Sequence, residues 1–328
     1  LKPTVEGEDA RKWRLRRGKF LIFPYIKEKG TYRLVDIKNY ENILRHLSRF
    51  KQQLSNRYDI RQSRQEWYEL RKCSYYSAFE SEKIVTPRES QTCNFSLDLE
   101  GYFCIDTCVV VVPKPEFLAE QKNKRTWWLL FVVGVLNSKL TEFYIKQIAT
   151  YRRGRWFEFF PQYLARIPIK LPETAKEKLY ADEIGESVKR ILAMSAKLDR
   201  SEEVEKRFSS LCRGLEMSRL DDYPSVIFNV SGKKFAQVRK EGTRVFLNLT
   251  DHVECSDEIV ANYVELYLRS IESEVSKAKE LKKVICGISI PSSRQDLRRV
   301  LEEYENMKKE KREIPDQIRS VEQEINQK

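Results

Sequence analysis

Histidine is nearly absent from this chain of 328 residues, which holds only His46 and His252. The two lie in different halves of the sequence, so a general acid–base site built on histidine is not expected. Common enzyme signatures are missing too: there is no GxGxxG, no P-loop, no HExxH, no GxSxG and no PD…(D/E)xK pattern. The Asn-Pro-Pro-Tyr tetrad of adenine methyltransferases and a glycine-rich bend for their methyl donor are also lacking. The sequence therefore predicts no complete catalytic site.

Long hydrophobic runs are absent as well. The most apolar run, Leu129 to Leu136, falls well short of the roughly 20 residues that a membrane-spanning helix needs. We therefore expect no membrane contact. The chain shows no signal peptide and opens with Leu-Lys-Pro-Thr, without an initiating Met, so we expect it to be a piece of a longer polypeptide.

Cysteine occurs seven times, at scattered positions and without a CxxC pair. An odd, scattered set argues against a disulfide framework and for a reducing compartment, the cytoplasm. Cys104 and Cys108 form the one close pair, in a run typical of a β-strand, where residues four apart are poorly spaced for a metal clip. We expect buried structural thiols and no metal site.

Positive charge is in excess and is concentrated in the first half. The net charge is +12, yet residues 1 to 171 hold 32 of the 61 Lys and Arg and 19 of the 49 Asp and Glu, which leaves −1 for the remainder. A basic balance indicates nucleic acid, an anionic membrane surface or an acidic partner. The asymmetry predicts a binding surface in residues 1 to 171 and an electrostatically neutral support after it.

The hydrophobic patterning predicts an α+β fold: a mixed curved β-sheet with flanking helices, then a largely helical extension that contains a small β-sheet. We place the first domain at residues 1–171, ending at the prolines of the segment 167–172, and the extension at 172–328. The extension is expected to hold a small β region over about 226–250 and a C-terminal helical pair over about 258–326.

Several elements can be placed more closely. Apolar runs on either side of Gly30 indicate a hairpin, and amphipathic or apolar stretches predict helices over about 40–55 and 126–148. Further helices are expected from Ala175 to Leu198 and from Glu202 to Met217, strands at 226–230, 235–238 and 244–247, and a break at Pro315. The spacing of apolar residues after 258 resembles a coiled-coil seam. Two alternatives stay open: these helices pack on their own domain or on another domain of the parent protein, or they self-associate.

Arginine interleaved with aromatic residues is the main indication of a binding site in this sequence. The segment from Tyr151 to Trp156 places three guanidinium groups on a turn at Gly154, and guanidinium forks match phosphate oxygens and the acceptor edge of guanine. The alternative is a solvated basic loop, but the flanking aromatic side chains favour a loop presented to nucleic acid. A second cluster over residues 11–19 has the same character. The candidate DNA-binding residues are Tyr151, Arg152, Arg153, Arg155, Trp156, Arg14, Arg16, Arg17 and Lys19. The neighbouring pair Trp127-Trp128 is expected in the core.

Several short motifs follow one another in a recognisable order. They are Lys2-Pro3, Gly7-Glu8-Asp9 and Trp13, the run Phe20–Tyr25, the helix residues Leu47–Phe50, Leu54 and Arg57, the segments Trp67–Arg71, Phe79-Glu80 and Lys83–Pro87, Leu136-Asn137-Ser138, Gly154 before an aromatic strand, and Ile167-Pro168-Ile169. In this order they resemble the TaqI-like specificity domain, the target-recognition module of adenine methyltransferases and type IIG restriction–modification proteins. The resemblance covers about residues 1–171.

This resemblance implies a domain that reads double-stranded DNA in the major groove. It further implies a methyltransferase domain of the same parent polypeptide, which flips an adenine out of the stack and methylates it with S-adenosylmethionine. In type IIG proteins a nuclease domain, with Mg²⁺, precedes the methyltransferase. No cofactor is expected in this chain itself. Two alternatives stay open: a stand-alone nuclease with an unrecognised carboxylate site, and an assembly or scaffold module acting through the C-terminal helices.

Overall fold

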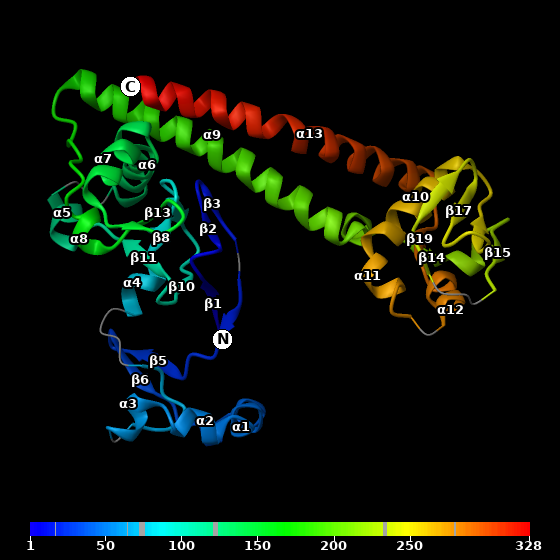
Figure 1. Cartoon of the computed structure of the whole chain (residues 1–328), viewed down its shortest axis with the longest axis horizontal. Helices are drawn as coiled ribbons and strands as arrows, with labels where there is room; N and C mark the ends of the chain where they lie inside the picture. Colours follow the sequence, from blue (N-terminus) through cyan, green and yellow to red (C-terminus); the bar gives the residue numbers. More distant parts are fainter. Residues whose placement is uncertain (17, 64, 72–75, 121–123, 232–234, 279) are drawn as a thin grey trace. The chain divides into compact units, whose positions relative to one another are not determined.

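The computed structural model describes the chain except residues 17, 64, 72–75, 121–123, 232–234 and 279 (Figure 1). It divides into two compact units: unit 1 comprises Leu1–Leu192 with Ser320–Lys328, and unit 2 comprises Ala193–Arg319. Both units combine strands with helices, so the predicted α+β class is confirmed. The proposed domains 1–171 and 172–328 stay a prediction; the compact units differ from them because the start of one long helix and the last residues of another pack with the first 171 residues.

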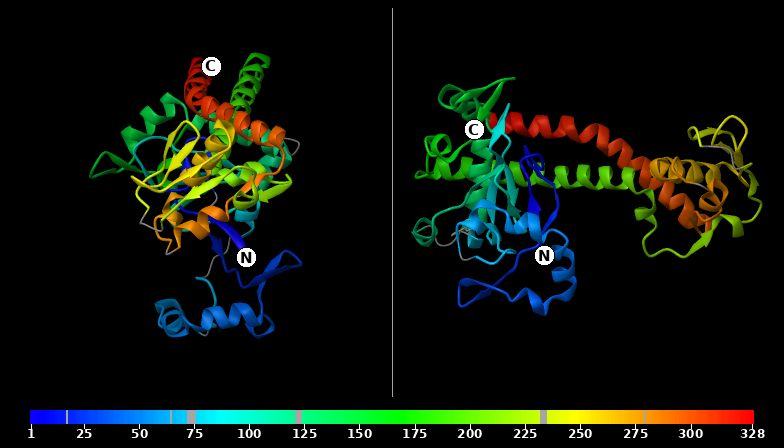
Figure 2. Two further views of the ribbon diagram at one scale, coloured as in Figure 1. Left: turned by 90° about the vertical axis from the view of Figure 1, so that its right-hand side faces the viewer. Right: turned by 60° about the horizontal axis from the view of Figure 1, so that its bottom comes forward.

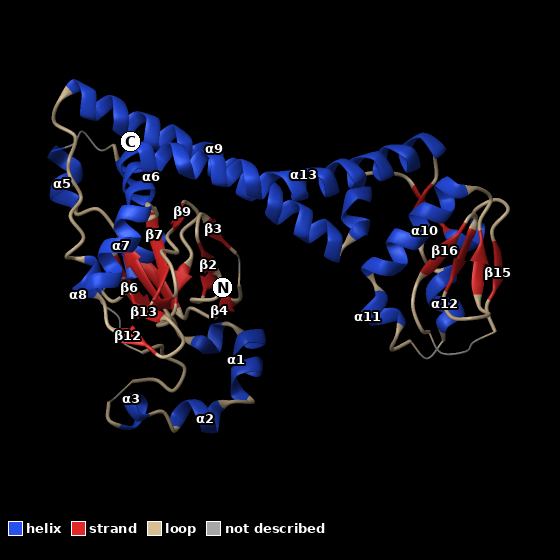
Figure 3. Cartoon of the chain, turned by 45° about the horizontal axis from the view of Figure 1, so that its top comes forward, coloured by secondary structure: helices blue, strands red, loops and turns tan. Residues whose placement is uncertain are grey.

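Unit 1 is built from small sheets flanked by helices (Figure 3). Its described strands form three three-stranded sheets, in the orders β10-β1-β4, β11-β7-β9 and β12-β13-β8, together with the hairpins β2–β3 and β5–β6. One sheet is mixed, as predicted, because β1 pairs parallel with β10 and antiparallel with β4. The strands are β1 Lys2–Val5, β2 Ala10–Arg11, β3 Arg14–Leu15, β4 Phe20–Leu21, β5 Tyr25–Glu28, β6 Thr31–Leu34, β7 Lys83–Pro87, β8 Glu89–Ser90, β9 Ser96–Asp98, β10 Phe103–Cys104, β11 Cys108–Val111, β12 Tyr151–Arg152 and β13 Trp156–Glu158. The helices are α1 Glu41–Ser48, α2 Lys51–Ser55, α3 Tyr58–Arg61, α4 Tyr76–Glu80, α5 Pro115–Glu120, α6 Arg125–Leu136, α7 Lys139–Ile148, α8 Pro161–Leu164 and the first part of α9 Ala175–Lys206.

Asn137 and Ser138 divide the helix predicted over 126–148 into α6 and α7. The amide of Asn137 pairs with the backbone of Phe95, accepting from its N–H (3.1 Å) and donating to its carbonyl (2.8 Å). The hydroxyl of Ser138 accepts from the N–H of Thr141 and so caps α7. Because Asn137 is buried, this motif ties α6 to the chain entering β9. Trp128 is buried in α6, as predicted, whereas Trp127 is only half-buried and its indole N–H donates to the carboxylate of Asp182 (2.6 Å).

Of two other predictions in unit 1, one is confirmed and the other holds only in part. The hairpin at Gly30 is confirmed, with β5 and β6 joined by a turn in which Gly30 adopts φ +84°. The helix expected over 40–55 is interrupted between Arg49 and Phe50, and none of the residues of α1 is fully buried. The apolar side chains of this segment are therefore only partly buried, and packing adds little to hold the segment as one continuous helix.

A buried ion pair lies at the centre of unit 1. Lys83 and Asp98 face each other across β7 and β9, and both side chains are fully buried. The ammonium of Lys83 also donates to the carbonyl of Phe79 at the end of α4 (2.6 Å). The carboxylate of Asp98 accepts from the backbone N–H groups of Glu100, Gly101 and Tyr102. Each charge thus has both an ionic and a hydrogen-bonded partner, which a buried ion needs.

Replacing Lys83 by Met should lower the free energy of unfolding of unit 1 by about 3–5 kcal/mol, because Asp98 would be left as an uncompensated buried charge. All five tryptophans lie in unit 1, so tryptophan fluorescence in a denaturant titration follows this unit alone. As a control, Lys189→Met breaks an exposed pair with Glu186 and should change the free energy by less than about 1 kcal/mol. Equal effects of the two substitutions would contradict the structural role of the buried pair.

Glu80, the last residue of α4, joins the β5–β6 hairpin to the rest of unit 1. Its carboxylate accepts from the hydroxyl of Tyr32 (2.6 Å) and forms ion pairs with Lys2 (2.9 Å) and Lys27 (3.3 Å). Burial alone would raise the pKa of Glu80, but the hydrogen bonds from Tyr32, Lys2 and Lys27 outweigh it and lower the pKa to about 2.

This lowered pKa predicts acid sensitivity. In the unfolded chain Glu80 takes up a proton near its ordinary pKa of 4.5, whereas in the folded chain it does so near 2, so its contribution to stability is present above pH 4.5 and is lost as the pH falls towards 2. Glu80→Gln should therefore flatten the fall in unfolding free energy between these pH values, followed by tryptophan fluorescence. Glu41→Gln, at an exposed position on α1, is the control. An acid limb unchanged by Glu80→Gln would show that this carboxylate does not link folding to pH.

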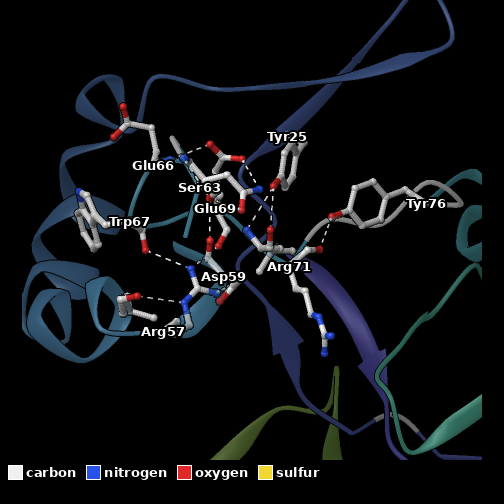
Figure 4. Close-up of polar contacts among 12 residues, drawn as sticks. Tyr25, Arg57, Asp59, Ser63, Glu66, Trp67, Glu69, Arg71 and Tyr76 are labelled. Atoms are coloured by element: carbon white, nitrogen blue, oxygen red, sulfur yellow. Dashed lines mark hydrogen bonds and ion pairs between the residues drawn. The ribbon is translucent and has the colours of Figure 1, made fainter. Parts of the chain in front are cut away.

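Arg57 organises the loop that follows α3 (Figure 4). Its guanidinium donates to the backbone carbonyls of Leu54 (3.1 Å), Trp67 (3.2 Å) and Glu69 (2.5 Å). The hydroxyl of Tyr25 accepts from the next N–H in the chain, that of Leu70, and so joins this loop to β5. The charge of Arg57 is thus used within the fold.

Unit 2 consists of a four-stranded antiparallel sheet, β15-β18-β17-β16, with helices packed on it and a separate two-stranded pairing of β14 with β19 (Figure 2). Tyr263 and Leu268 of α10 are fully buried in its core beside Val245 and Val253 of the sheet. The elements are the rest of α9, β14 Met217–Arg219, β15 Ile227–Asn229, β16 Arg239–Glu241, β17 Arg244–Phe246, β18 His252–Glu254, α10 Glu258–Ser270, α11 Glu272–Val275, α12 Leu281–Cys286, β19 Ser289–Pro291 and α13 Arg294–Gln327. Short 3₁₀ turns lie at 37–39, 208–212 and 220–222.

Four predictions for the second half are wrong. Helix α9 runs without the predicted break at 199–201, and within it Ser201 is buried and donates to the carbonyl of Lys197 one turn earlier. Helix α9 then ends at Lys206, so the helix predicted from Glu202 to Met217 is replaced by a 3₁₀ turn at 208–212 and the start of β14. Residues 235–238 are not a strand; pairing begins at Arg239. Helix α13 continues through Pro315, although a proline costs about 3 kcal/mol within a helix. The burial of Ile314 next to it favours the helix despite that cost.

The apolar spacing of α13 is matched by α9 of the same chain. Within unit 2 three ion pairs link the two helices: Lys197–Glu310, Arg200–Glu303 and Glu205–Lys311. Within unit 1 Arg190–Glu324 also links them, and Glu183 of α9 pairs with Lys328, just beyond the end of α13. Exposed pairs of this kind contribute little each, about 0–1 kcal/mol. The seam of α13 is thus covered at least in part by its own chain, whereas the pair predicted within 258–326 resolves into α10, α11, α12 and α13.

Two sequence-based expectations concern the thiols and the membrane. Cys93, Cys212 and Cys255 are buried, and burial raises the pKa of Cys93 and of Cys255 to about 12. Cys104 ends β10 and Cys108 begins β11, so a turn separates them, not the continuous strand that was expected. In the described part of the chain no single helix is long and apolar enough to cross a membrane; α6 with α7 would qualify by length and composition, but the two are bent by 67°.

Candidate nucleic-acid interface

The arginine segment forms a β-hairpin. Strands β12 and β13 pair Tyr151 with Phe157 and Arg152 with Trp156, so residues 153–155 make the turn. Gly154 has φ +81° and Arg155 has φ +63°. The left-handed region suits glycine, but it costs a residue with a side chain about 1–2 kcal/mol. An arginine held there despite this cost is typical of a position kept for function.

The base of the hairpin is buried. Strand β13 also pairs with β8, where Phe157 faces Ser90 and Glu158 faces Glu89. The next residue, Phe159, is almost fully buried, and its N–H donates to the carbonyl of Arg88 (2.8 Å). The hairpin is therefore anchored in the core of unit 1 while its turn projects into solvent.

The three arginines of the hairpin are not equivalent. Arg152 forms an ion pair with the buried carboxylate of Glu158, and its Nε donates to the same oxygen (2.7 Å). Arg153 and Arg155 are exposed, and no other described residue forms a hydrogen bond or ion pair with either side chain. Two unpaired guanidinium groups thus lie on one turn, where they repel each other and gain nothing from folding. A polyanionic ligand would supply the missing partners.

A groove of about 720 Å³ lies beside the hairpin. Trp156, 42% exposed, forms part of its wall, and Gln91 connects groove and turn by donating from Nε2 to the carbonyl of Gly154 (3.0 Å). The lining residues come from the turn after β1, from β2, from the end of β7 through β8 into the turn that follows it, from the turn between β10 and β11, and from β13 and the residues just after it. They are Gly7, Glu8, Arg11, Pro87, Arg88, Glu89, Ser90, Gln91, Thr92, Asn94, Asp106, Thr107, Trp156 and Phe160.

Internal bonds hold the groove wall in place. The guanidinium of Arg88 lies over the ring of Phe160 (4.7 Å) and donates to the carbonyl of Asp106 (2.9 Å). In the residue after Asp106, the hydroxyl of Thr107 accepts from the N–H of Gly7 (2.9 Å). The groove is therefore formed by the fold itself and is already present without a ligand.

The second basic cluster is arranged differently. Lys19 forms an ion pair with Glu6 (2.8 Å), which raises the pKa of Lys19. Arg16 is exposed and Arg14 half-buried, and both have partners within the fold. Arg17 lies outside the described residues. Of the described candidates Arg14, Arg16 and Lys19, none lines the groove, whereas Arg11 of the same cluster does.

Tyr151 completes the set of predicted residues. It is 60% exposed on β12, and its ring meets that of Phe157 edge to face (5.6 Å). The register places Tyr151 with Phe157 on one face of the hairpin and Trp156 with Arg152 on the other. Arg153 and Arg155 lie in the turn between the two strands. Sequence reasoning missed Gln91 and Arg88, because β8 lies more than 60 positions before β13 and no local pattern links the two strands.

The part of the chain that holds the hairpin and the groove also matches a known protein family. The family model of the TaqI-like C-terminal specificity domain matches residues 3–169, just over half of the chain. The chain belongs to this family. It therefore carries a target-recognition domain of restriction–modification systems, and TaqI-like specificity domains are not themselves catalytic. The predicted resemblance is confirmed, and the hairpin and the groove both lie within the matched residues.

Other comparisons add less. The chain is similar to the S subunit of a type I restriction-modification system from M. genitalium, at 11% identity, with 75% of this chain and 83% of that chain covered and a TM-score of 0.36. It is also similar to the HsdS subunit from Thermoanaerobacter tengcongensis, at 12% identity, with 74% and 78% covered and a TM-score of 0.25. Scores this low establish neither a common fold nor a common function. No curated protein matches the chain.

Because Arg152 is ion-paired and Arg153 and Arg155 are not, substitutions of these arginines should have two different effects. Arg152→Ala should lower the unfolding free energy by about 1–3 kcal/mol, because Glu158 loses its partner while buried. Arg153→Ala and Arg155→Asn should leave stability unchanged or, for Asn at a left-handed position, slightly raised, yet weaken binding to a fluorescent DNA duplex. If a triple Ala variant that still folds binds DNA as well as the unmodified chain, the hairpin is a solvated turn only.

Proposed function

We propose that this chain selects the target sequence of a restriction–modification enzyme by reading double-stranded DNA with the arginine hairpin and the adjacent groove. The observation that carries the proposal is the pair of unpaired, exposed guanidinium groups of Arg153 and Arg155 beside a preformed groove. The charge distribution supports it, because residues 1–171 hold the whole excess of positive charge. Arginine is the side chain best suited to both phosphate and guanine.

The proposal extends to the partner domain. A methyltransferase domain of the same parent polypeptide would methylate an adenine of the selected site, and a type IIG parent would also cleave DNA with Mg²⁺. The methyl donor, S-adenosylmethionine, would be held by that domain, because this sequence has neither a glycine-rich bend nor the Asn-Pro-Pro-Tyr tetrad. The contribution of this chain is to bind and orient the duplex. Its place of action would be the cytoplasm.

Binding should depend steeply on salt. Each phosphate that a side chain neutralises releases a counterion and adds about −0.9 to the slope of log affinity against log salt concentration. Removing Arg153 or Arg155 should therefore make the slope shallower by about one unit if that residue contacts phosphate. If it contacts a guanine edge, its loss should instead cost about 1–3 kcal/mol at a single base pair.

The measurement is fluorescence anisotropy of the full chain with a labelled duplex between about 50 and 200 mM salt. Arg239→Ala, an exposed arginine of β16 in unit 2, serves as the matched control and should leave the slope unchanged. Affinity that is independent of ionic strength would refute the proposal, and an equal effect of Arg239→Ala would place the DNA outside the hairpin surface.

A further inference from the structure

Gln91 is held in an orientation that matches one base. It follows β8 at the edge of the groove, is exposed, and donates from Nε2 to the carbonyl of Gly154 in the turn of the arginine hairpin (3.0 Å). We infer that Gln91 is a specificity-determining residue that recognises adenine in the DNA target. The inference rests on the proposed function and adds to it the residue and the base.

The bond to Gly154 fixes the two ends of the Gln91 amide. A carbonyl oxygen only accepts hydrogen bonds, so the atom that faces it must be the amide nitrogen. One N–H is thereby used, and the other N–H and the oxygen Oε1 are left for a ligand. An acceptor beside a donor is the pattern that binds adenine, whose N6 amino group donates and whose N7 accepts. The fold thus removes the rotational ambiguity that a free glutamine would have.

Three other polar side chains of the groove, Asn94, Arg11 and Arg88, are engaged in the fold. Asn94 accepts from the N–H of Lys12 (3.1 Å) and donates to the hydroxyl of Ser90 (2.8 Å), so its amide supports the turn after β8. Arg11 donates to the carbonyls of Gly7 and Ala10. Arg88 is committed to Phe160 and Asp106, as described above. Of the two amide side chains among the described lining residues, Gln91 therefore keeps a free acceptor and a free donor.

The position of Gln91 also suits base recognition. Phosphate contacts place a protein on the duplex, and contacts to base edges confer specificity. The hydrogen bond to Gly154 sets the Gln91 amide directly beside the turn that carries Arg153 and Arg155. Guanidinium groups that bind the backbone would hold this amide at a constant distance from the bases, so that one adenine is read in a fixed register.

The test is selection from a library of randomised DNA duplexes by the full chain at low ionic strength, with sequencing of the bound fraction. Four proteins are compared: the unmodified chain, Gln91→Ala, Gln91→Met, which keeps the length of the side chain but removes the amide, and Gln53→Ala. Gln53 is an exposed residue of α2 outside the groove and is the matched control. Thermal unfolding of each variant establishes that it is folded.

We expect the unmodified chain and Gln53→Ala to enrich the same motif. Gln91→Ala and Gln91→Met should lose the preference for one A·T pair by about 5- to 150-fold, the equivalent of about 1–3 kcal/mol, and keep the other positions. A motif that is unchanged in both Gln91 variants, or an affinity that falls equally for all sequences, would overturn the inference and leave the proposed function standing. If the unmodified chain enriches no motif, the proposed function itself fails and this inference fails with it.

Discussion

The buried pair of Lys83 and Asp98 is the constraint on which unit 1 depends. Two charges without access to water are tolerable only when every donor and acceptor around them is satisfied. Lys83 therefore fixes the end of α4, and Asp98 fixes the turn that leads into β10. That turn sets the parallel pairing of β10 with β1, and α4 carries the carboxylate that binds the β5–β6 hairpin. Several small sheets are thereby held in one arrangement without a single large sheet.

Much of this fold could be predicted from sequence where local patterns decide the structure. The hairpin at Gly30, the buried strand β7 and the apolar helix α6 each follow from composition and period. Errors arise where a distant contact outweighs the local signal. Asn137 ends α6 because its amide bonds the backbone of Phe95, 42 positions away. Pro315 stays within a helix although its ring removes a hydrogen bond, because the helix around it is packed.

The candidate site shows the same division. Arginine and aromatic residues close in sequence predicted a basic turn at Gly154, and the structure shows that this turn belongs to a β-hairpin. Sequence could not rank the three arginines, because the partner that neutralises Arg152 is defined by strand register. It could not identify Gln91 either, since an isolated glutamine in a turn carries no pattern. Its proposed role follows from its hydrogen bond to Gly154, 63 positions away in the sequence.

The contrast between the buried base and the exposed turn of the arginine hairpin has an evolutionary consequence. Phe159 and Glu158 are buried, so most substitutions there should lower the stability of the folded state. At the turn, side chains can be exchanged with little effect on the folded state. If the turn reads DNA as proposed, single substitutions there would change the target sequence while the buried base keeps the hairpin folded. The residues free to vary and the residues needed for folding thus lie at opposite ends of one short hairpin.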